Sequence, residues 1–416
     1  MVSSNNRLRG LRLIGCTLAL VSMVACSSDD SDDPAADGGG EGGASGEGGS
    51  SGTGDDGGSG EDGGSGEDGG SGAGGTSGDG GAVDPNAITA EDMVWTWVDF
   101  DDSFCRDGST AGIAVSLNSA SDKVMIFMQG GGACFDVFTC GTNPANADTQ
   151  KGEITTGVFN RSHEANPVAD WNFVFIPYCT GDVHLGTNEE GTVEGVDGVH
   201  KFVGRKNIEA YLKRIVPTFA DASQVLLTGV SAGGFGAAAN MEVVQEAFGD
   251  IPVTAIDDSG PPMSNEFLAT CLQEKWRTTW GFDDSILKDC GEDCPDPNDY
   301  SIPYTVHVAN KYPDRMGGLI ETTSDAIISG FYGYGTNDCM GSFFTAVPPA
   351  TFEMGLLDYR ERLIELDANL GTYYIPGSSH TWLAGNPFFE TEVDGVLLVD
   401  WFTDIIEGTA AAHVGP

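Results

Sequence analysis

The chain is poor in basic residues, with 19 Lys and Arg against 63 Asp and Glu, and its formal net charge at pH 7 is −44. Residues 85–416 alone hold 48 acidic and 16 basic residues, so the acidity is not confined to the N-terminal part. A surface of this sign repels the phosphates of nucleic acids and of anionic lipids. We therefore expect no nucleic acid as a partner.

The chain also lacks an apolar run long enough for a membrane span, which needs about 20 residues. The stretch Leu13–Ala25 is shorter and follows three arginines, as in a secretory signal. Cys26 comes directly after Val24-Ala25, an arrangement that resembles a bacterial lipobox. We predict that residues 1–26 are a lipoprotein signal, that Cys26 is lipidated and that the protein is exported and anchored in the outer membrane. An ordinary signal peptide with an incidental Cys is the alternative.

Large apolar and basic residues are missing from residues 27–84, which contain only Gly, Ser, Asp, Glu, Ala, Pro, Thr and one Val. Such a composition cannot bury enough apolar surface to offset the entropy lost on ordering. We predict a disordered acidic tether here, followed by one large domain over residues 85–416.

Histidine is scarce, with six in the chain, whereas cysteine is not. An even number of Cys in an exported domain predicts disulfides but not their pairing. Cys134 with Cys140 and Cys290 with Cys294 are close enough for local loops, although spacing alone establishes neither pair. No His adjoins Cys290 or Cys294, so we expect no metal site. The eight cysteines of the domain are Cys105, Cys134, Cys140, Cys179, Cys271, Cys290, Cys294 and Cys339.

The domain alternates short apolar runs with helical segments, which is typical of an α/β sheet. Near-continuous apolar runs indicate parallel strands that are buried on both faces. Residues 264–314 form an irregular insertion, rich in Asp and Pro and containing cysteines, where a cap over a site would lie; a solvated loop is preferred there over a calcium site. The predicted strands are 123–128, 172–177, 224–228, 253–257, 316–322 and 372–376, and the predicted helices are 205–215 and 235–248.

A G-x-S-x-G pattern occurs twice, at Gly48–Gly52 in the tether and at Gly229–Gly233 in the domain. Only the second follows a predicted strand and precedes a predicted helix. A sharp turn there lifts the hydroxyl above the sheet and places it at the helix N-terminus. We predict that Ser231, and not Ser50, is a catalytic nucleophile.

A serine hydroxyl needs a base, and the order along an α/β-hydrolase chain is Ser, acid, His. His380 follows the last predicted strand, where the base belongs. Asp325 follows the preceding strand and is the predicted acid, with the role of orienting the imidazole. The alternative acids are Asp257, Asp258 and Asp338.

The oxyanion of an acyl-transfer reaction needs backbone amides aimed at it. One is predicted to be the amide of Ala232, directly after the nucleophile. The others are predicted to be the amides of Gly131 and Gly132, because a strand followed by a run of glycines resembles the oxyanion loop of this fold.

Together these residues resemble the pectinacetylesterase/Notum family of carboxylesterases. The resemblance implies an α/β-hydrolase fold, a triad of Ser231, Asp325 and His380, deacylation of a carbohydrate or glycoprotein ester, and no cofactor. It also places the 178–184 loop near the site. Asp182 and His184 in this loop are then expected either to support the site or to have a purely structural role. The matching stretches are Gln129–Asp136 (QGGGACFD), Ile176–His184 (IPYCTGDVH), Gly229–Gly234 (GVSAGG) and Ser378–His380 (SSH).

Animal Notum enzymes carry a Trp-Tyr pair where this chain has Gly132 and Ala133, so the bacterial and plant esterases resemble it more. This favours an acetylated polysaccharide as substrate, although the acidic surface would repel polyanionic pectin at low ionic strength. The alternatives are a lipase, thioesterase or peptidase on the same scaffold, and a surface binding lipoprotein without catalytic activity.

Overall fold

The computed structural model describes residues 84–148 and 153–416. The predicted signal, Cys26 and residues 27–83 of the predicted tether therefore lie outside the described residues. Within the described part, no helix combines the length and the apolar character that a membrane crossing requires. The described residues group as one compact unit.

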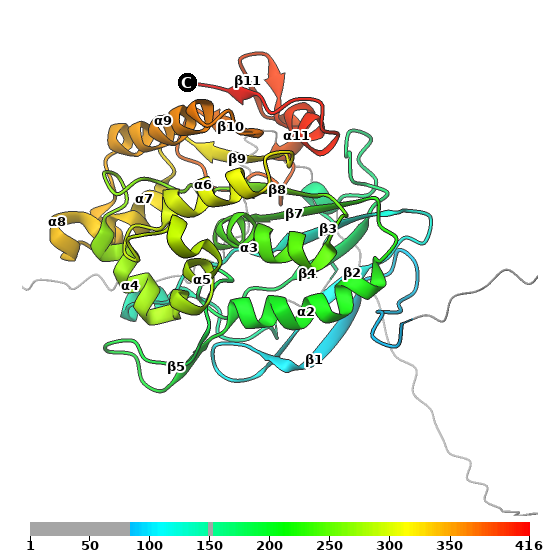
Figure 1. Ribbon diagram of the computed structural model, residues 1–416, viewed down its shortest axis with the longest axis horizontal. Coiled ribbons are helices and arrows are strands. Elements are labelled where there is room, and N and C mark those ends of the chain that lie inside the picture. Colours follow the sequence, from blue (N-terminus) through cyan, green and yellow to red (C-terminus); the bar gives the residue numbers. More distant parts are fainter. Residues whose placement is uncertain (1–83, 149–152) are drawn as a thin grey trace, which may run out of the picture. The chain divides into compact units, whose positions relative to one another are not determined.

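A nine-stranded sheet forms the centre of this unit, in the order β1-β2-β4-β3-β7-β8-β9-β10-β13 (Figure 1). The strands from β4 to β13 pair in parallel, while β1 and β2 add an antiparallel edge. The prediction of a mostly parallel sheet is confirmed, and β1, β2 and β13 are additions to the predicted strands. The bounds are β1 (Thr96–Phe104), β2 (Thr110–Ser116), β3 (Lys123–Met128), β4 (Asn172–Ile176), β7 (Gln224–Val230), β8 (Val253–Asp258), β9 (Gly317–Thr322), β10 (Leu370–Ile375) and β13 (His413–Val414).

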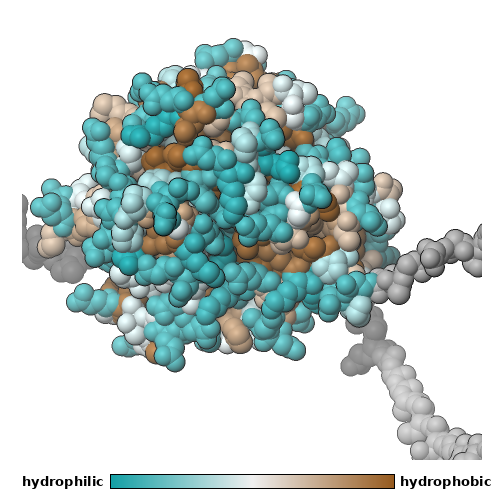
Figure 2. Space-filling view, in the orientation of Figure 1, coloured by the Kyte–Doolittle hydropathy of each residue, from teal (hydrophilic) through white to brown (hydrophobic). Residues whose placement is uncertain are grey.

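Helices cover both faces of the sheet, which explains why its central strands are apolar along their whole length. Alternate residues of β3 enter different cores: Ile126 packs with α2 (Gly204–Thr218) and α3 (Ala232–Phe248), and Phe127 packs with α11 (Leu398–Ile406). Both predicted helices are present as α2 and α3. The surface over the α2 and α3 face is largely hydrophilic, with separate apolar patches (Figure 2).

The insertion between β8 and β9 is largely helical, so the prediction of an irregular segment was wrong. It contains α4 (Thr270–Trp280), α5 (Ile286–Cys290) and α6 (Ser301–Lys311). Its many acidic and proline residues conceal the helical pattern in the sequence, whereas its aromatic residues are buried in one of the cores. No group of His, Cys, Asp or Glu in the described ranges is arranged to hold a metal ion.

Four disulfides join all eight cysteines of the domain, which confirms the prediction of disulfides. Two close local loops, a third links the end of β1 to the loop after β4, and the fourth ties α4 to α8. The pairs are Cys105–Cys179, Cys134–Cys140, Cys271–Cys339 and Cys290–Cys294. The remaining elements are α1 (Val137–Thr142), β5 (Asn188–Gly191), β6 (His200–Phe202), α7 (Ala326–Tyr332), α8 (Thr336–Cys339), α9 (Pro349–Glu365), α10 (Pro387–Glu390), β11 (Glu392–Val393) and β12 (Val396–Leu397), with short 3-10 turns at Gly157–Phe159, Phe282–Asp284, Gly291–Asp293, Gly333–Gly335 and Phe343–Thr345.

Candidate active site

Ser231 lies on a sharp turn between the end of β7 and the start of α3. Its φ of 58° is in the left-handed region, which non-glycine residues seldom adopt. The flanking glycines are required by close backbone contacts: a Cβ on Gly229 would lie 2.3 Å from the carbonyl oxygen of Gly233, and one on Gly233 would lie 2.0 Å from that of Met128. The local sequence therefore favours the turn that places the Ser231 hydroxyl at the N-terminus of α3.

His380 and Asp325 are paired by a hydrogen bond of 2.6 Å between Nδ1 and Oδ2. Asp325 is fully buried, and its Oδ1 accepts the amides of Ile327 and Ile328 at the N-terminus of α7, at 2.8 and 2.9 Å. The carboxylate is thus fixed by the helix that it caps. In the described part of the chain Nε2 of His380 has no hydrogen-bond partner. Because Nδ1 donates its proton to Asp325, Nε2 carries the lone pair that a general base needs.

Asp258 connects the turn of Ser231 to the loop of His380. Its backbone carbonyl accepts the amide of Ser231 at 2.7 Å. Its Oδ2 accepts the amides of Trp382 and Leu383, both at 2.7 Å. Burial raises the pKa of Asp258 to about 6, although these two amides oppose the shift. Asp258, one of the alternative acids, therefore has a positioning role in the structure.

The other two alternative acids are placed away from the imidazole pair. Asp338 is exposed on α8. Asp257 is buried, and it lines a different cavity from Ser231. Of the four candidate carboxylates, Asp325 is the one that bonds to His380.

Glu321, in β9, is a buried carboxyl near Asp325 that sequence analysis did not single out. Its Oε1 accepts the amide of Thr322 at 2.7 Å. Burial, followed by the charge of Asp325, raises the pKa of Glu321 well above its ordinary value.

The glycine loop after β3 packs directly against the turn of Ser231. A Cβ on Gly130 would lie 2.9 Å from the Cβ of Ser231, so only glycine fits there. Gly132 adopts a φ of 78° and, together with Ala232, lines the same hollow as Ser231. The carbonyl of Gly131 accepts a hydrogen bond from Nδ2 of Asn143 at 2.8 Å. Two of the three predicted oxyanion residues therefore border the hollow, and Asn143 fixes the third.

Asp182 and His184 hold this glycine loop in place from behind. Nε2 of His184 donates to the carbonyl of Gln129, the residue before the glycines, at 2.9 Å. Oδ1 of Asp182 accepts from the Thr180 hydroxyl at 2.6 Å and from the His184 amide at 3.2 Å, and Oδ2 accepts the amide of Gly204 at 2.8 Å. Burial raises the pKa of Asp182 to about 6 and lowers that of His184 to about 4.

The low pKa of His184 predicts a measurable pH dependence of stability. The unfolded chain binds a proton at His184 more readily than the folded one, so this contribution is complete above about pH 6.5 and is lost as the pH falls towards 4. Between about pH 7 and pH 5 the wild type should lose about 2 kcal/mol more of its unfolding free energy than His184→Gln does. Urea titrations at both pH values measure this difference.

His163→Gln is the matched control, because His163 is half-buried and stacks on Phe389. It should follow the wild type at both pH values. Equal pH dependence in the wild type and His184→Gln would contradict the neutral, buried state of His184.

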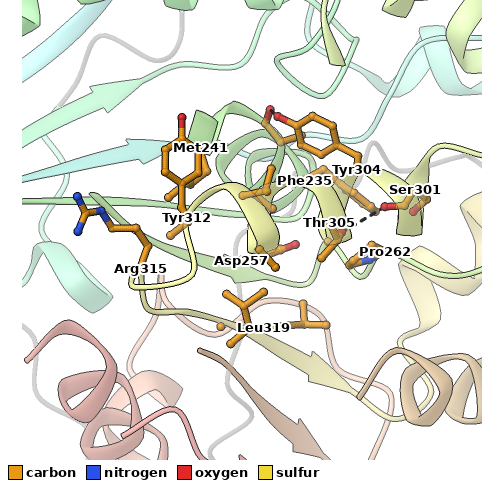
Figure 3. A pocket seen from close by; sticks show the side chains of 18 of the residues that line it. Phe235, Met241, Asp257, Pro262, Ser301, Tyr304, Thr305, Tyr312, Arg315 and Leu319 are labelled. Atoms are coloured by element: carbon orange, nitrogen blue, oxygen red, sulfur yellow. Dashed lines mark hydrogen bonds between the residues drawn. The ribbon is translucent and has the colours of Figure 1, made fainter. Parts of the chain in front are cut away.

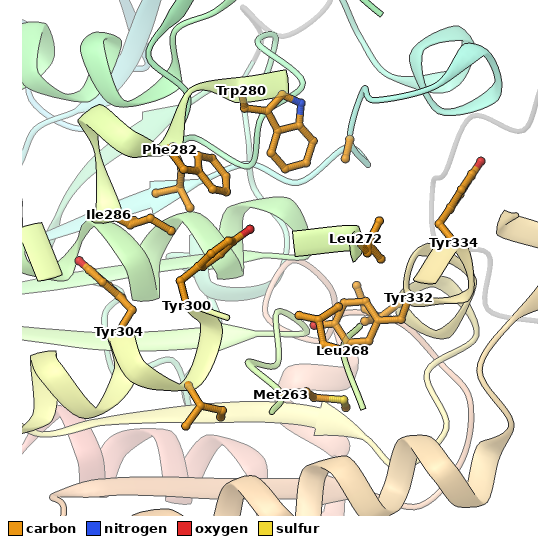
Figure 4. Close-up of a cluster of buried hydrophobic side chains, with 14 of the residues drawn as sticks. Met263, Leu268, Leu272, Trp280, Phe282, Ile286, Tyr300, Tyr304, Tyr332 and Tyr334 are labelled. Carbon is orange, nitrogen blue, oxygen red and sulfur yellow. The ribbon is translucent and has the colours of Figure 1, made fainter. Parts of the chain in front are cut away.

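An apolar hollow lies beside Ser231 and is formed largely by the insertion. The insertion contributes Leu268, Trp276, Trp280 and Phe282, and α7 contributes Ile328 and Phe331. The space between the lining side chains, its opening to solvent included, is about 640 Å³. Figure 4 shows Trp280 and Phe282 of this wall, next to Tyr300.

Comparison with known proteins finds sequence similarity to one family of carboxylesterases and a shared fold. A family model described as pectinacetylesterase matches residues 89–290. Palmitoleoyl-protein carboxylesterase notum2 from Xenopus laevis is 33% identical over 174 residues, which cover 38% of this chain and 34% of that protein. The human palmitoleoyl-protein carboxylesterase NOTUM is 29% identical over 175 residues, covering 39% and 34%. The chain thus matches about a third of the length of these relatives.

The structure of the Wnt deacylase Notum from Drosophila superimposes with a TM-score of 0.59 and 18% identity, and covers 77% of this chain and 94% of that one. At this identity the likeness concerns the fold, and it extends over nearly the whole neighbour. The predicted α/β-hydrolase-like architecture is therefore confirmed.

Proposed function

We propose that this chain, which resembles the pectinacetylesterase/Notum family over residues 89–290, is a carboxylic ester hydrolase in which Ser231 is the nucleophile, His380 the base and Asp325 the orienting acid. The observation that carries the proposal is the 2.6 Å hydrogen bond from Nδ1 of His380 to Asp325, with Asp258 tying the same histidine loop to the turn of Ser231. No metal or organic cofactor takes part in the proposed steps.

The proposed reaction proceeds through an acyl-enzyme. Nε2 of His380 takes the proton of Ser231 as Oγ attacks the ester carbonyl, and the imidazolium is stabilised by Asp325. The oxyanion faces the amides of Gly132 and Ala232. When the tetrahedral intermediate collapses, His380 returns the proton to the leaving alcohol. Water then attacks the acyl-enzyme by the same route and releases the carboxylic acid.

The acyl group of the substrate is proposed to occupy the apolar hollow beside Ser231. The aromatic side chains that line it favour an aliphatic acyl chain longer than acetyl, because each buried methylene contributes about 0.8 kcal/mol. The printed names of the relatives, which describe removal of a palmitoleoyl group from protein, support this substrate class. Deacetylation of a polysaccharide is the second candidate, and the description of the matching family model supports it.

Export and anchoring in the outer membrane through a lipid on Cys26 form part of the proposal. Their support is the leader sequence, with its arginines, its short apolar run and its Val-Ala-Cys junction.

A series of p-nitrophenyl esters from acetyl to decanoyl tests the acyl preference. We expect kcat/KM to rise at least about tenfold from acetyl to octanoyl, because the added methylenes leave water for an apolar wall. Leu268→Trp fills part of the hollow and should remove this rise while acetyl ester hydrolysis stays within about threefold of the wild type.

Leu357→Trp is the control, because Leu357 is exposed on α9. It should reproduce the wild-type series. A preference for acetyl over octanoyl esters in the wild type would instead favour the polysaccharide acetylesterase.

A further inference from the structure

A second apolar cavity lies between the sheet and α6, on the other side of a shared wall from the hollow of Ser231. Met241 of α3, Val308 of α6 and Leu319 of β9 are among the residues that line it. The space between its walls, openings included, is about 1070 Å³. Neither Ser231 nor Ala232 borders this cavity, so it is distinct from the proposed catalytic site.

The wall between the two spaces is formed by Leu185, Phe235, Tyr300 and Ser301, which line both. Figure 3 shows Asp257 in the middle of the second cavity, between Phe235 and Leu319, with Tyr312 and Arg315 towards one end. The cavity therefore has an apolar body with one acidic group inside it.

Asp257 differs from the other buried aspartates in lacking hydrogen-bond partners. It is 4% exposed, and within the described part of the chain neither carboxyl oxygen makes a hydrogen bond of good geometry. The amide of Gly260 acts on it weakly, whereas burial, followed by the charge of Asp258, raises its pKa well above the ordinary value. By contrast, Asp325 accepts two amides and an imidazole N–H. A buried carboxyl without partners destabilises the fold unless a ligand satisfies it.

Two of the hydroxyl groups that line this cavity already make hydrogen bonds. The hydroxyl of Tyr304 donates to the carbonyl of Ala239 at 2.8 Å, and that of Thr305 to the carbonyl of Ser301 at 3.2 Å. Asp257 is thus a buried polar group that is available inside the cavity, and the guanidinium of Arg315, whose Nε donates to Gln245, lies towards one end. Burial raises the pKa of Asp257, which favours the protonated carboxyl, and a protonated carboxyl can both donate and accept a hydrogen bond.

We propose that this second cavity binds an uncharged lipid-like molecule, an aliphatic chain with one hydroxyl or amide group that hydrogen-bonds to the carboxyl of Asp257. The apolar walls enclose the chain, and charged head groups are disfavoured because they would have to leave water. The proposal does not depend on the proposed esterase function, since the two spaces have different polar groups.

Isothermal titration of the full chain with 1-decanol, decanoate and decyltrimethylammonium tests the proposal. These probes share one chain length and differ in the head group. We expect decanol to bind most tightly, with a stoichiometry of one. Tightest binding of decanoate would assign the recognition to Arg315 and overturn the role of Asp257, and the absence of binding by all three probes would overturn the site.

Four variants locate the binding. Asp257→Leu should weaken decanol binding at least about tenfold, while Asp257→Asn, which keeps the hydrogen-bonding ability, should stay within about threefold of the wild type. Val308→Trp fills the second cavity and should abolish binding. Leu268→Trp fills the hollow of Ser231 and should leave binding unchanged; loss of binding in this variant, with retention in Val308→Trp, would place the ligand at the catalytic site and refute the proposal.

The melting temperature of Asp257→Leu separates loss of a ligand site from loss of the fold. Replacing an unpartnered buried carboxyl with an apolar side chain of similar size should raise the melting temperature of the ligand-free protein. A variant that binds less and melts higher supports the inference. A variant that melts lower would show that Asp257 stabilises the fold, which contradicts its having no partner.

Discussion

Ser231→Ala is expected to lower kcat for p-nitrophenyl octanoate by about 10⁴-fold or more, because it removes the atom that forms the acyl-enzyme. The hollow and the glycine loop remain, so KM should change little. A fluorophosphonate probe should label the wild type and not the variant. Progress curves with both proteins, together with mass spectrometry of the labelled peptide, measure the effect.

Ser223→Ala is the matched control, since Ser223 is exposed and directly precedes the first residue of β7, whereas Ser231 follows the last. It should keep full activity and labelling. Equal activity in Ser231→Ala and the wild type would refute the proposed mechanism. If neither protein hydrolysed any ester of the series, the result would favour a binding protein.

Asp325→Asn is expected to reduce kcat by about 10⁴-fold with little change in KM or in folding. The amide oxygen can still accept the Ile327 and Ile328 amides that hold the side chain. The NH₂ group, however, meets Nδ1 of His380 and favours the tautomer in which Nδ1 is unprotonated. Nε2 then carries the proton and cannot act as the base. Steady-state kinetics and circular dichroism on the same preparation separate loss of catalysis from loss of fold.

Asp338→Asn is the matched control. Asp338, like Asp325, lies between β9 and His380 in the sequence, but it is exposed on α8. It should keep wild-type kcat. Loss of activity in Asp338→Asn with retention in Asp325→Asn would show that the His380–Asp325 hydrogen bond is not the catalytic one.

Much of the sheet was predictable because parallel strands that are buried on both faces have continuous apolar sequences. The turn at Ser231 was predictable for a similar reason: its glycines act locally, through contacts between neighbouring strand, turn and helix. The insertion was not, since acidic residues and prolines between and within its helices conceal their apolar pattern. These helices depend on burying Trp280 and Phe282 against distant parts of the chain.

The sequence by itself determined the order of strands and helices, the turn at Ser231 and the order Ser, Asp, His, because these depend on residues near one another in the chain. Only the tertiary structure decided which acid pairs with His380. Asp258 ends β8 and Asp325 follows the adjacent strand β9, and their roles differ in which atoms of the histidine loop they contact. The two cavities and the unpartnered carboxyl of Asp257 were likewise decided there, because a space between packed elements has no pattern along the chain.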